Sequence, residues 1–470
     1  MRCRIERLPI SLLAIVTCGL IWNISDAATL ELDFDYFKNE IQPIFLAKRP
    51  GNVACVSCHG GAASSNFHLQ PLSAGRFFWD EAQSRKNFEA AKQFVTPGTK
   101  PLDSRLLSHP LARDAGGDPF HGGGKHWSSQ ADAEWQIIKR WTEGASVREP
   151  IRKTVVRIVQ TNSAGDNVHV IDPATNKVAG VINDIQIPHG VVGAPDGRAL
   201  YVTNESLHTL DVVDSRTLRV WRRVPLSGRP NNLAITKDGA QLFVGIMEMP
   251  GSVDVVDTAT FQVTKTIEVD GAIHNVYVTP DGRYAVAGSI QTRTINVIDI
   301  AKQELLWKLQ LESGIRPMAF DTLADGSTKN IYVQLSNFHG FVVVDFAKHT
   351  QIAKIEHPPI ANAHAHYDGL QGAPAHGLAI TPDGKFLWST SKVFGYAYVY
   401  ALPDLREVGR VFVGQHPEWI AMTPDGKFAY IGAAGDNQTF VIDVRHLKEI
   451  ARIPVGQVPK RNATVVMALP

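Results

Sequence analysis

Two cysteines and a histidine stand together in the run Cys55-Val56-Ser57-Cys58-His59. Two thioether bonds to the vinyl groups of a haem need cysteines at about this spacing, and a histidine next to the second cysteine then reaches the iron. A zinc site would need two further ligands at a matching spacing, and a redox dithiol would need a βαβ pattern around it. The sequence offers neither. The motif therefore predicts one covalent haem c, attached through Cys55 and Cys58, with His59 as an axial ligand of the iron.

The other two of the four cysteines, Cys3 and Cys18, lie in an N-terminal segment that is typical of a signal peptide. Three arginines among the first seven residues precede the short apolar stretch 10–24, and residues 25–27 offer a cleavage site. We expect residues 1–27 to be removed and the mature protein to be periplasmic or secreted, with no stable membrane span. The alternatives are an uncleaved membrane anchor and, through Cys18, a lipoprotein.

The overall composition excludes several classes of function. The formal net charge of +1 argues against a nucleic-acid-binding protein, which normally carries an excess of basic residues. Hydrophobic residues make up 44% of the chain and charged residues 20%, which is ordinary for a soluble globular protein. A glycine-rich nucleotide-binding fingerprint is missing from the sequence, so we expect no nicotinamide or flavin cofactor.

A small helical domain, residues 29–146, is predicted around the haem motif. Residues 35–46 carry Phe37, Ile41 and Ile44 at helical spacing, and a second helix is predicted over 129–142, from an N-cap at Ser129 to a stop at Gly144. A helix before the motif and a helix at the end of the domain resemble the cytochrome c fold, in which these two helices cross. The resemblance covers about a quarter of the chain.

The second axial ligand departs from the usual pattern of that class, which supplies a methionine. Met1 is the only methionine before Met247, so a histidine is the next choice, and it would lower the reduction potential. We expect His121, because the run 121–126 stands where the methionine loop usually precedes the last helix. Its three glycines let the backbone pass close to a flat ligand. The alternatives are His126, then His109, or an open five-coordinate haem, and His68 is the remaining histidine of the domain.

A repeat begins near residue 155, where short β-branched runs alternate with turns. The aspartates of six similar turns are Asp196, Asp238, Asp281, Asp325, Asp383 and Asp425. Four of the five steps between these aspartates are 42 to 44 residues long, and the remaining step of 58 residues contains an insertion. Four short strands in each repeat of about 40 to 50 residues are typical of a β-propeller blade. The run Tyr201–Asn204 and the valine-rich strands ending in aspartate resemble the YVTN family of β-propellers, across residues 153–470.

The number of innermost strands gives the number of blades. Six of them precede the turns, and a seventh is predicted at 462–469. Three strands at 155–160, 168–172 and 178–182 have no inner partner, so joining them to the C-terminal strand completes a seventh blade and leaves no open edge. The predicted fold is therefore an α plus all-β multidomain protein: a helical cytochrome c-like domain, then a seven-bladed propeller closed by its N- and C-terminal strands.

The residue near the start of each innermost strand should line one mouth of the central channel. By register these residues are His189, Asn231, His274, Met318, His376, Glu418 and Lys460 or Arg461. The inserted loop, 357–372, should bring His364 and His366 to the same face. Three converging imidazoles, His189, His274 and His376, predict a site for substrate, a transition metal or a second redox cofactor. The alternative is a polar channel filled with water.

These features predict an exported haem c electron-transfer protein, an oxidoreductase whose histidine-lined propeller face binds a substrate, a metal or a second cofactor. Its expected partner is a periplasmic redox protein. The combination is similar to the cytochrome cd1 group, in which histidines above the propeller handle a second haem. That group has eight blades, so its specific activity is not carried over. One alternative is a non-catalytic electron carrier whose propeller is a protein-docking scaffold. A lactonase-like enzyme with an accessory haem ranks lowest, because paired carboxylates are not evident in the sequence.

Overall fold

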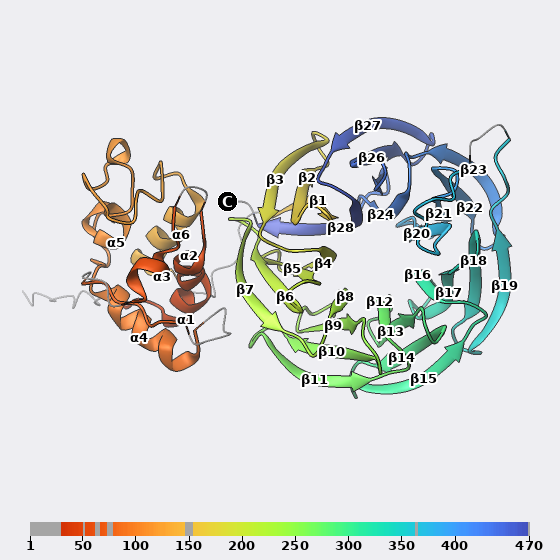
Figure 1. Ribbon diagram of the computed structural model, residues 1–470, viewed down its shortest axis with the longest axis horizontal. Coiled ribbons are helices and arrows are strands. Elements are labelled where there is room, and N and C mark those ends of the chain that lie inside the picture. Colours follow the sequence, from red (N-terminus) through yellow and green to blue (C-terminus); the bar gives the residue numbers. More distant parts are fainter. Residues whose placement is uncertain are drawn as a thin grey trace, which may run out of the picture.

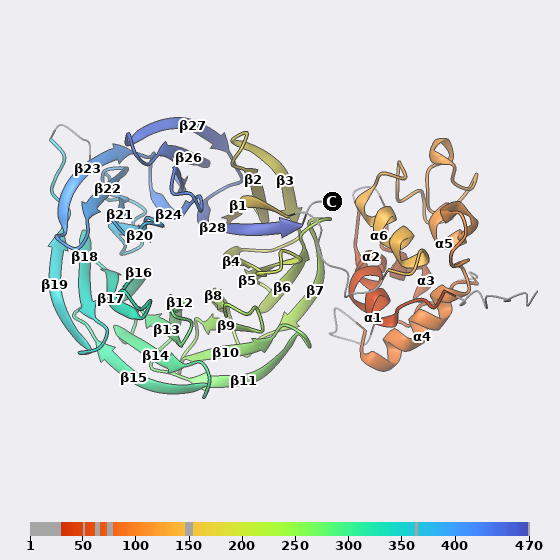
Figure 2. The same cartoon turned by 180° about the vertical axis from the view of Figure 1, so that it is seen from behind.

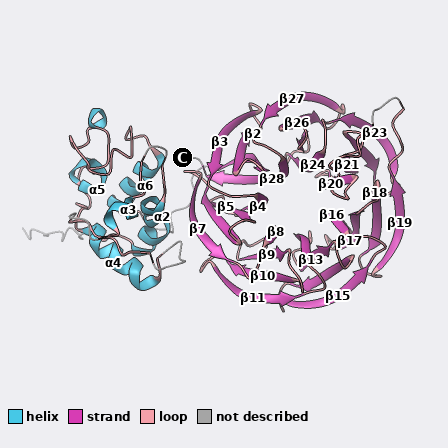
Figure 3. Cartoon of the chain, viewed as in Figure 1, coloured by secondary structure: helices cyan, strands magenta, loops and turns pink. Residues whose placement is uncertain are grey.

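The computed structural model describes residues 30–49, 52–61, 66–72, 79–145, 154–361 and 365–468. An N-terminal helical region lies beside a β-propeller of seven four-stranded blades (Figure 1), and the view from behind shows the same ring (Figure 2). Helices and strands separate cleanly between the two parts (Figure 3). The predicted signal peptide, 1–27, lies outside the described residues. In the part of the chain that the structure describes, no helix is long and apolar enough to cross a membrane.

Three consecutive segments form the first helical stretch: α1 (Phe34–Tyr36), the π-helical turn η1 (Phe37–Ile41) and α2 (Gln42–Leu46). The side chain of Asp33 accepts a hydrogen bond from the backbone N–H of Tyr36 at 2.6 Å and so caps its start. The remaining elements are α3 (Cys55–His59), α4 (Glu81–Lys92), η2 (Pro101–Asp103), α5 (Arg105–Ser108), η3 (Arg113–Ala115) and α6 (Ala133–Thr142).

The last helix begins later than the sequence indicates. Asp132, not Ser129, is the N-cap of α6, because its side chain accepts from the backbone N–H of Glu134 at 2.9 Å. The Ser129 hydroxyl instead accepts from the N–H of Ala131 at 3.1 Å in the preceding turn. Both residues suit a cap, and the turn before the helix decides between them.

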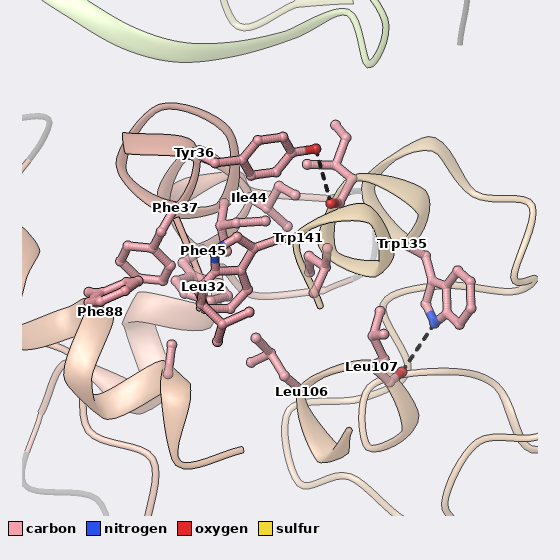
Figure 4. Close-up of a cluster of buried hydrophobic side chains, with 14 of the residues drawn as sticks. Leu32, Tyr36, Phe37, Ile44, Phe45, Phe88, Leu106, Leu107, Trp135 and Trp141 are labelled. Carbon is pink, nitrogen blue, oxygen red and sulfur yellow. Dashed lines mark hydrogen bonds between the residues drawn. The ribbon is translucent and has the colours of Figure 1, made fainter. Parts of the chain in front are cut away.

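The first and last helices pack against each other around aromatic rings (Figure 4). The rings of Phe37 and Trp141 lie 5.3 Å apart, and the Tyr36 hydroxyl donates to the carbonyl of Ile137 at 3.3 Å. Trp135, also on α6, donates through Nε1 to the carbonyl of Leu107 at 3.2 Å. Burial of such large side chains contributes about 2 to 3 kcal/mol each, so this core fixes the frame that carries α3.

The blades follow one another along the chain, each with its innermost strand first. The first two consist of β4 (Pro188–Gly193), β5 (Ala199–Asn204), β6 (Thr209–Asp214), β7 (Arg219–Pro225), and β8 (Pro230–Ile235), β9 (Gln241–Ile246), β10 (Ser252–Asp257), β11 (Gln262–Glu268). The next two consist of β12 (Ile273–Val278), β13 (Tyr284–Ser289), β14 (Thr294–Asp299), β15 (Glu304–Gln310), and β16 (Ile315–Thr322), β17 (Thr328–Leu335), β18 (Gly340–Asp345), β19 (Thr350–Glu356). The fifth and sixth consist of β20 (Ala375–Ile380), β21 (Phe386–Ser391), β22 (Tyr396–Ala401), β23 (Arg406–Phe412), and β24 (Pro417–Met422), β25 (Phe428–Ala433), β26 (Gln438–Asp443), β27 (Lys448–Pro454).

The seventh blade is built from both ends of the propeller sequence. Its sheet order is β28-β1-β2-β3, with β28 (Pro459–Ala468) as the innermost strand and β1 (Thr154–Asn162), β2 (Asn167–Asp172) and β3 (Lys177–Asn183) outside it. The pairing of β28 with β1 is antiparallel, with Val156 opposite Val466. The predicted seven-bladed propeller is thus confirmed.

Each repeated turn connects the first two strands of a blade and is stabilised by hydrogen bonds within the turn. In the third blade, Asp281 accepts a hydrogen bond from the hydroxyl of Thr279 at 2.6 Å and one from the N–H of Arg283 at 3.1 Å. Gly282 follows with a φ of +78°, a left-handed conformation that glycine adopts without strain. This chemistry explains why the Asp-Gly pairs mark the blades so regularly in the sequence.

The helical region contacts the outer edge of the first blade. Arg216, in the loop before β7, forms an ion pair with Glu40 of η1. Arg219, at the start of β7, donates to the carbonyl of Lys48 at 3.1 Å. The helical region therefore lies against the rim of the ring and not over its central channel (Figure 1).

Candidate functional site

The Cys55-to-His59 motif forms α3, a single helical turn. Both cysteines are free thiols and partly buried, at the surface of the helical core. Burial raises the pKa of the Cys55 thiol, and the charge of the neighbouring Arg49 guanidinium opposes that shift. Arg49 itself is buried and forms an ion pair with Glu134 of α6 at 2.6 Å. A buried charge pair thus lies beside the two thiols.

The imidazoles of His59 and His121 lie close together at this site, with nearly parallel planes. Their ring centres are 6.2 Å apart and their planes lie within 18°. Nδ1 of His59 lies 2.9 Å from the carbonyl oxygen of Phe67, and Nδ1 of His121 lies 2.6 Å from that of Gly124. A carbonyl can only accept, so Nδ1 carries the proton in both rings and Nε2 has the lone pair that binds metals.

The other histidines of the helical region differ in their surroundings. His109 lies 4.8 Å from His121 between ring centres, and its Nδ1 contacts a carboxylate oxygen of Asp118 at 2.7 Å. His126 is buried, and burial followed by the charge of Arg49 lowers its pKa to about 4. His68 is exposed. The structure therefore brings His109 and His126 to the edge of the pair and leaves His68 at the surface.

Glycines let the backbone pass between these rings. A Cβ on Gly123 would lie 3.3 Å from Cε1 of His121 and 3.7 Å from Nε2 of His126. Gly124 has a φ of +82°, and a Cβ there would lie 2.6 Å from Oδ1 of Asn52. A larger residue at either position would therefore have to displace a neighbouring side chain.

A second candidate site lies at one mouth of the propeller channel, where each innermost strand places its second residue. These residues are His189, Asn231, His274, Arg316, His376, Glu418 and Lys460. The ring centres of His189 and His274 are 6.4 Å apart, and those of His274 and His376 are 6.1 Å apart. The structure thus brings together the three imidazoles that the sequence placed at equal register.

Met318 was wrongly placed in this ring by the sequence. Strands β16 and β17 have eight residues each, whereas β4 and β5 have six, so their hairpin is two residues longer. Counting back from the turn at Asp325 therefore stops two residues short of the mouth. Met318 is buried in the hydrophobic core between blades, and Arg316 occupies the mouth position.

The structure describes only part of the inserted loop. His364 lies outside the described residues. His366 donates its backbone N–H to the carbonyl of Val393 and lines a hollow of 240 Å³ with His416 and Lys392. Over the described ranges, no group of three or more His, Cys, Asp or Glu side chains has the spacing to hold a metal ion. A metal at the propeller mouth stays a prediction.

Two of the three imidazoles are paired with glutamates, one of which sequence reasoning missed. Nδ1 of His189 is hydrogen-bonded to a carboxylate oxygen of Glu205, and the amide of Asn231 donates to the same oxygen at 3.1 Å. Nδ1 of His376 lies 2.6 Å from Oε2 of Glu418, with the two atoms too poorly aligned for a hydrogen bond. A carboxylate beside Nδ1 orients a ring so that Nε2 can act as a base.

Two lysines keep Glu418 ionised although it is buried. Lys392 and Lys460 donate to its Oε1 at 2.9 and 3.1 Å. Burial alone would raise the pKa of Glu418, but Lys460 and the other nearby cations hold it well below the usual range. Glu205 and Lys392 each directly follow the second strand of their blade. That shared position was the signal that could have located both.

Burial favours the neutral form of all three imidazoles. Burial lowers the pKa of His376 to about 3 and holds that of His274 well below 6.5, with the charge of Arg461 adding to the effect at His274. The pKa of His189 is lowered by burial and then by Arg461. Neutral imidazoles can donate or accept a proton, so this mouth has the groups that acid–base chemistry requires.

Comparison with solved structures identifies the fold of the propeller. A chain of hydrazine synthase from Kuenenia stuttgartiensis matches with a TM-score of 0.50 and 24% identity, over 58% of this chain and 88% of that one. A periplasmic gluconolactonase of Pseudomonas aeruginosa matches with a TM-score of 0.54 and 22% identity, over 67% of this chain and 100% of that one. A candidate 6-phosphogluconolactonase of Bacteroides fragilis matches with a TM-score of 0.54 and 18% identity, over 68% of this chain and 99% of that one. No family model and no curated protein sequence matches the chain.

Proposed function

We propose that this protein is an exported electron-transfer protein that carries one haem c. Cys55 and Cys58 would form the two thioether bonds, and His59 and His121 would be the axial ligands of the iron. The observation that supports this most is the separation of the two rings, 6.2 Å between centres. Two metal–nitrogen bonds of about 2 Å each, with half a ring on either side, amount to roughly 6 Å.

The residues around the motif fit the group. Both cysteines are free, the two Nδ1 atoms are held by backbone carbonyls, and glycines at 123 and 124 let the loop pass close to His121, His126 and Asn52. When bound, haem c supplies a one-electron redox centre. The carbonyls of Phe67 and Gly124 orient the imidazoles and raise their basicity.

The position of the helical region favours exchange with another protein. It packs against the rim of the first blade, through Arg216 with Glu40 and Arg219 with Lys48, so the haem would lie beside the ring. We infer that a periplasmic or secreted redox partner docks at the haem. The propeller mouth, with its two histidine–glutamate pairs, favours a substrate site over a bare docking scaffold. An oxidoreductase role is the first choice, and a hydrolase role like that named for the gluconolactonase neighbours is the second.

Covalent haem attachment is tested directly on the protein produced with its leader in a host that matures c-type cytochromes. After denaturing electrophoresis, the wild-type band should stain for haem peroxidase activity, and Cys55→Ala with Cys58→Ala should abolish the stain. Ser57→Ala, between the two cysteines, is the matched control and should keep it. Haem that extracts into acidified organic solvent from the wild-type protein would contradict the proposal.

A further inference from the structure

The mouth of the propeller channel holds more positive than negative charge. Its charged groups are two carboxylates and four cations: Glu205, Glu418, Arg316, Lys392, Lys460 and Arg461. Five of the six are at most 9% exposed, and the side chain of Lys460 is 16% exposed. With the three imidazoles neutral, the surplus is two positive charges. Burying a charge without a partner of opposite sign raises the free energy of the folded protein. This surplus therefore favours binding of a negatively charged group.

Both carboxylates are already engaged by other groups. Glu418 accepts hydrogen bonds from Lys392 and Lys460, and Glu205 binds His189 and Asn231. Within the described ranges, Arg316 and Arg461 have no carboxylate within 4 Å. Arg316 donates instead to the hydroxyl of Ser336 at 2.9 Å and to the carbonyl of Gln371 at 2.7 Å. The two arginines therefore carry the surplus.

Arg461 is the more deeply buried of the two, at 2% exposure. Its Nη2 donates to Oδ1 of Asn231 at 2.7 Å and to the carbonyl of His274 at 3.3 Å. Its guanidinium carbon lies 4.1 Å from the centre of the Trp419 ring. No acceptor among the described residues takes the N–H groups of Nε and Nη1. Three of the five N–H donors of a guanidinium are on these two nitrogens, so three donors of Arg461 have no acceptor among the described residues.

His274 extends this donor surface. It lies between His189 and His376, and the amide nitrogen of Asn275 is 2.8 Å from its Nδ1. An amide N–H donating to Nδ1 leaves the ring proton on Nε2, where it can be donated to a ligand. A bound cation would add to the surplus of charge, whereas an anion would offset it.

We propose that the channel mouth binds a small oxyanion, as the carboxylate or phosphate group of a ligand, with Arg461 as its main partner and His274 as a second donor. Arg316 adds long-range attraction from the neighbouring strand. The indole of Trp419 holds the guanidinium plane in place from the other side. This site does not depend on the haem.

Titration calorimetry of the full-length holoprotein tests the site, with acetate, succinate and inorganic phosphate as probes at constant ionic strength set with sodium chloride. We expect saturable binding of at least one probe at one site per chain. Arg461→Gln should weaken that binding at least tenfold, about 1.4 kcal/mol. Arg452→Gln, which removes an exposed arginine on the outer strand β27, is the matched control and should not change it. Stronger binding of the carboxylates or of phosphate identifies the group recognised.

The outcomes separate this site from the haem proposal. The Cys55→Ala, Cys58→Ala variant should bind the probe with unchanged affinity, whether or not the haem proposal holds. If Arg461→Gln fails to fold, Arg316→Gln provides the second test and should weaken binding severalfold. The proposal is overturned if none of the three probes binds saturably to the wild type, or if both arginine variants bind as tightly as the wild type.

Discussion

His59 and His121 lie with parallel imidazole planes, 18° apart, and with ring centres separated by 6.2 Å. The two residues come from a one-turn helix and from a glycine-rich loop that is distant in sequence. Each ring is oriented by a contact between its Nδ1 and a backbone carbonyl. This relationship distinguishes His121 from the other histidines around the motif and leads to the first prediction.

His121→Ala should convert a low-spin haem into a high-spin one, because the sixth ligand is lost while His59 stays. Absorption spectra of the oxidised and reduced protein measure the change. His109→Ala is the matched control, since His109 is tied to Asp118 and should leave the spectrum low-spin. If His126→Ala alone produced the high-spin spectrum, the second ligand would be His126.

Glu134→Gln should destabilise the helical region by about 3 kcal/mol, because it leaves the buried Arg49 guanidinium without its carboxylate. Trp127 also donates to Glu134, at 3.1 Å, so a second hydrogen bond is altered. Urea unfolding followed at the haem absorption band measures the loss. Glu143→Gln, which removes an exposed i,i+4 partner of Lys139, should cost less than about 1 kcal/mol. Equal losses in the two variants would refute the assignment.

Glu418→Gln should destabilise the propeller by about 3 to 5 kcal/mol. The reason is that Lys392, which is only 3% exposed, would lose the carboxylate that neutralises its charge. Calorimetric unfolding measures the change. The control is Glu407→Gln on the outer strand β23, where the pair with Arg410 is partly exposed and a loss below about 1 kcal/mol is expected. A Glu418→Gln protein as stable as the wild type would show that the lysines are solvated.

The stability of the propeller should fall as the pH is lowered from 6.5. Burial lowers the pKa of His339 to about 4 and holds that of His357 well below 6.5, so the folded state stays neutral where the unfolded chain takes up protons. Stability is then fully present above pH 6.5, and each such histidine removes about 1.4 kcal/mol per pH unit below it. Urea unfolding at pH 7.5, 6.5 and 5.5 measures the slope.

His357→Gln should reduce that slope by about one proton, because His357 is 2% exposed and hydrogen-bonded to Tyr400. Gln262→Ala, at the exposed start of the outer strand β11, removes no titratable group and is the control, so it should leave the slope unchanged. A slope identical in the wild type and His357→Gln would mean that His357 is protonated in the folded state.

Register explains how much of this molecule could be predicted from its sequence. The blades were found because Thr279, Asp281 and their equivalents repeat a local hydrogen-bond pattern that leaves the same trace each time. His189 and His376 were found because each precedes such a turn by the same distance. Arg316 was missed because one hairpin is longer, a change that leaves the turn intact.

The partners of the channel histidines could not be predicted in the same way. Glu205 and Lys392 follow second strands, and Arg461 comes from the last strand, so only the closed arrangement of blades brings them to His189 and His376. The packing of His121 against His59 likewise depends on how the glycine-rich loop is held, for example by the hydrogen bond from the N–H of His126 to the carbonyl of Pro110. Contacts between elements distant in sequence leave no local trace in residue spacing.

The sheet shared by β1 and β28 also constrains when the chain can fold. A ribosome must make roughly 300 residues between these two strands before Val156 can meet Val466. During that time the backbone donors and acceptors on the inner edge of β1 are unpaired. They can therefore pair wrongly with a strand of another chain. Assembly of the ring is therefore a late event of biogenesis. Late closure of the ring would keep the propeller unfolded for longer. A polypeptide that must be unfolded in order to cross a membrane would benefit from this delay.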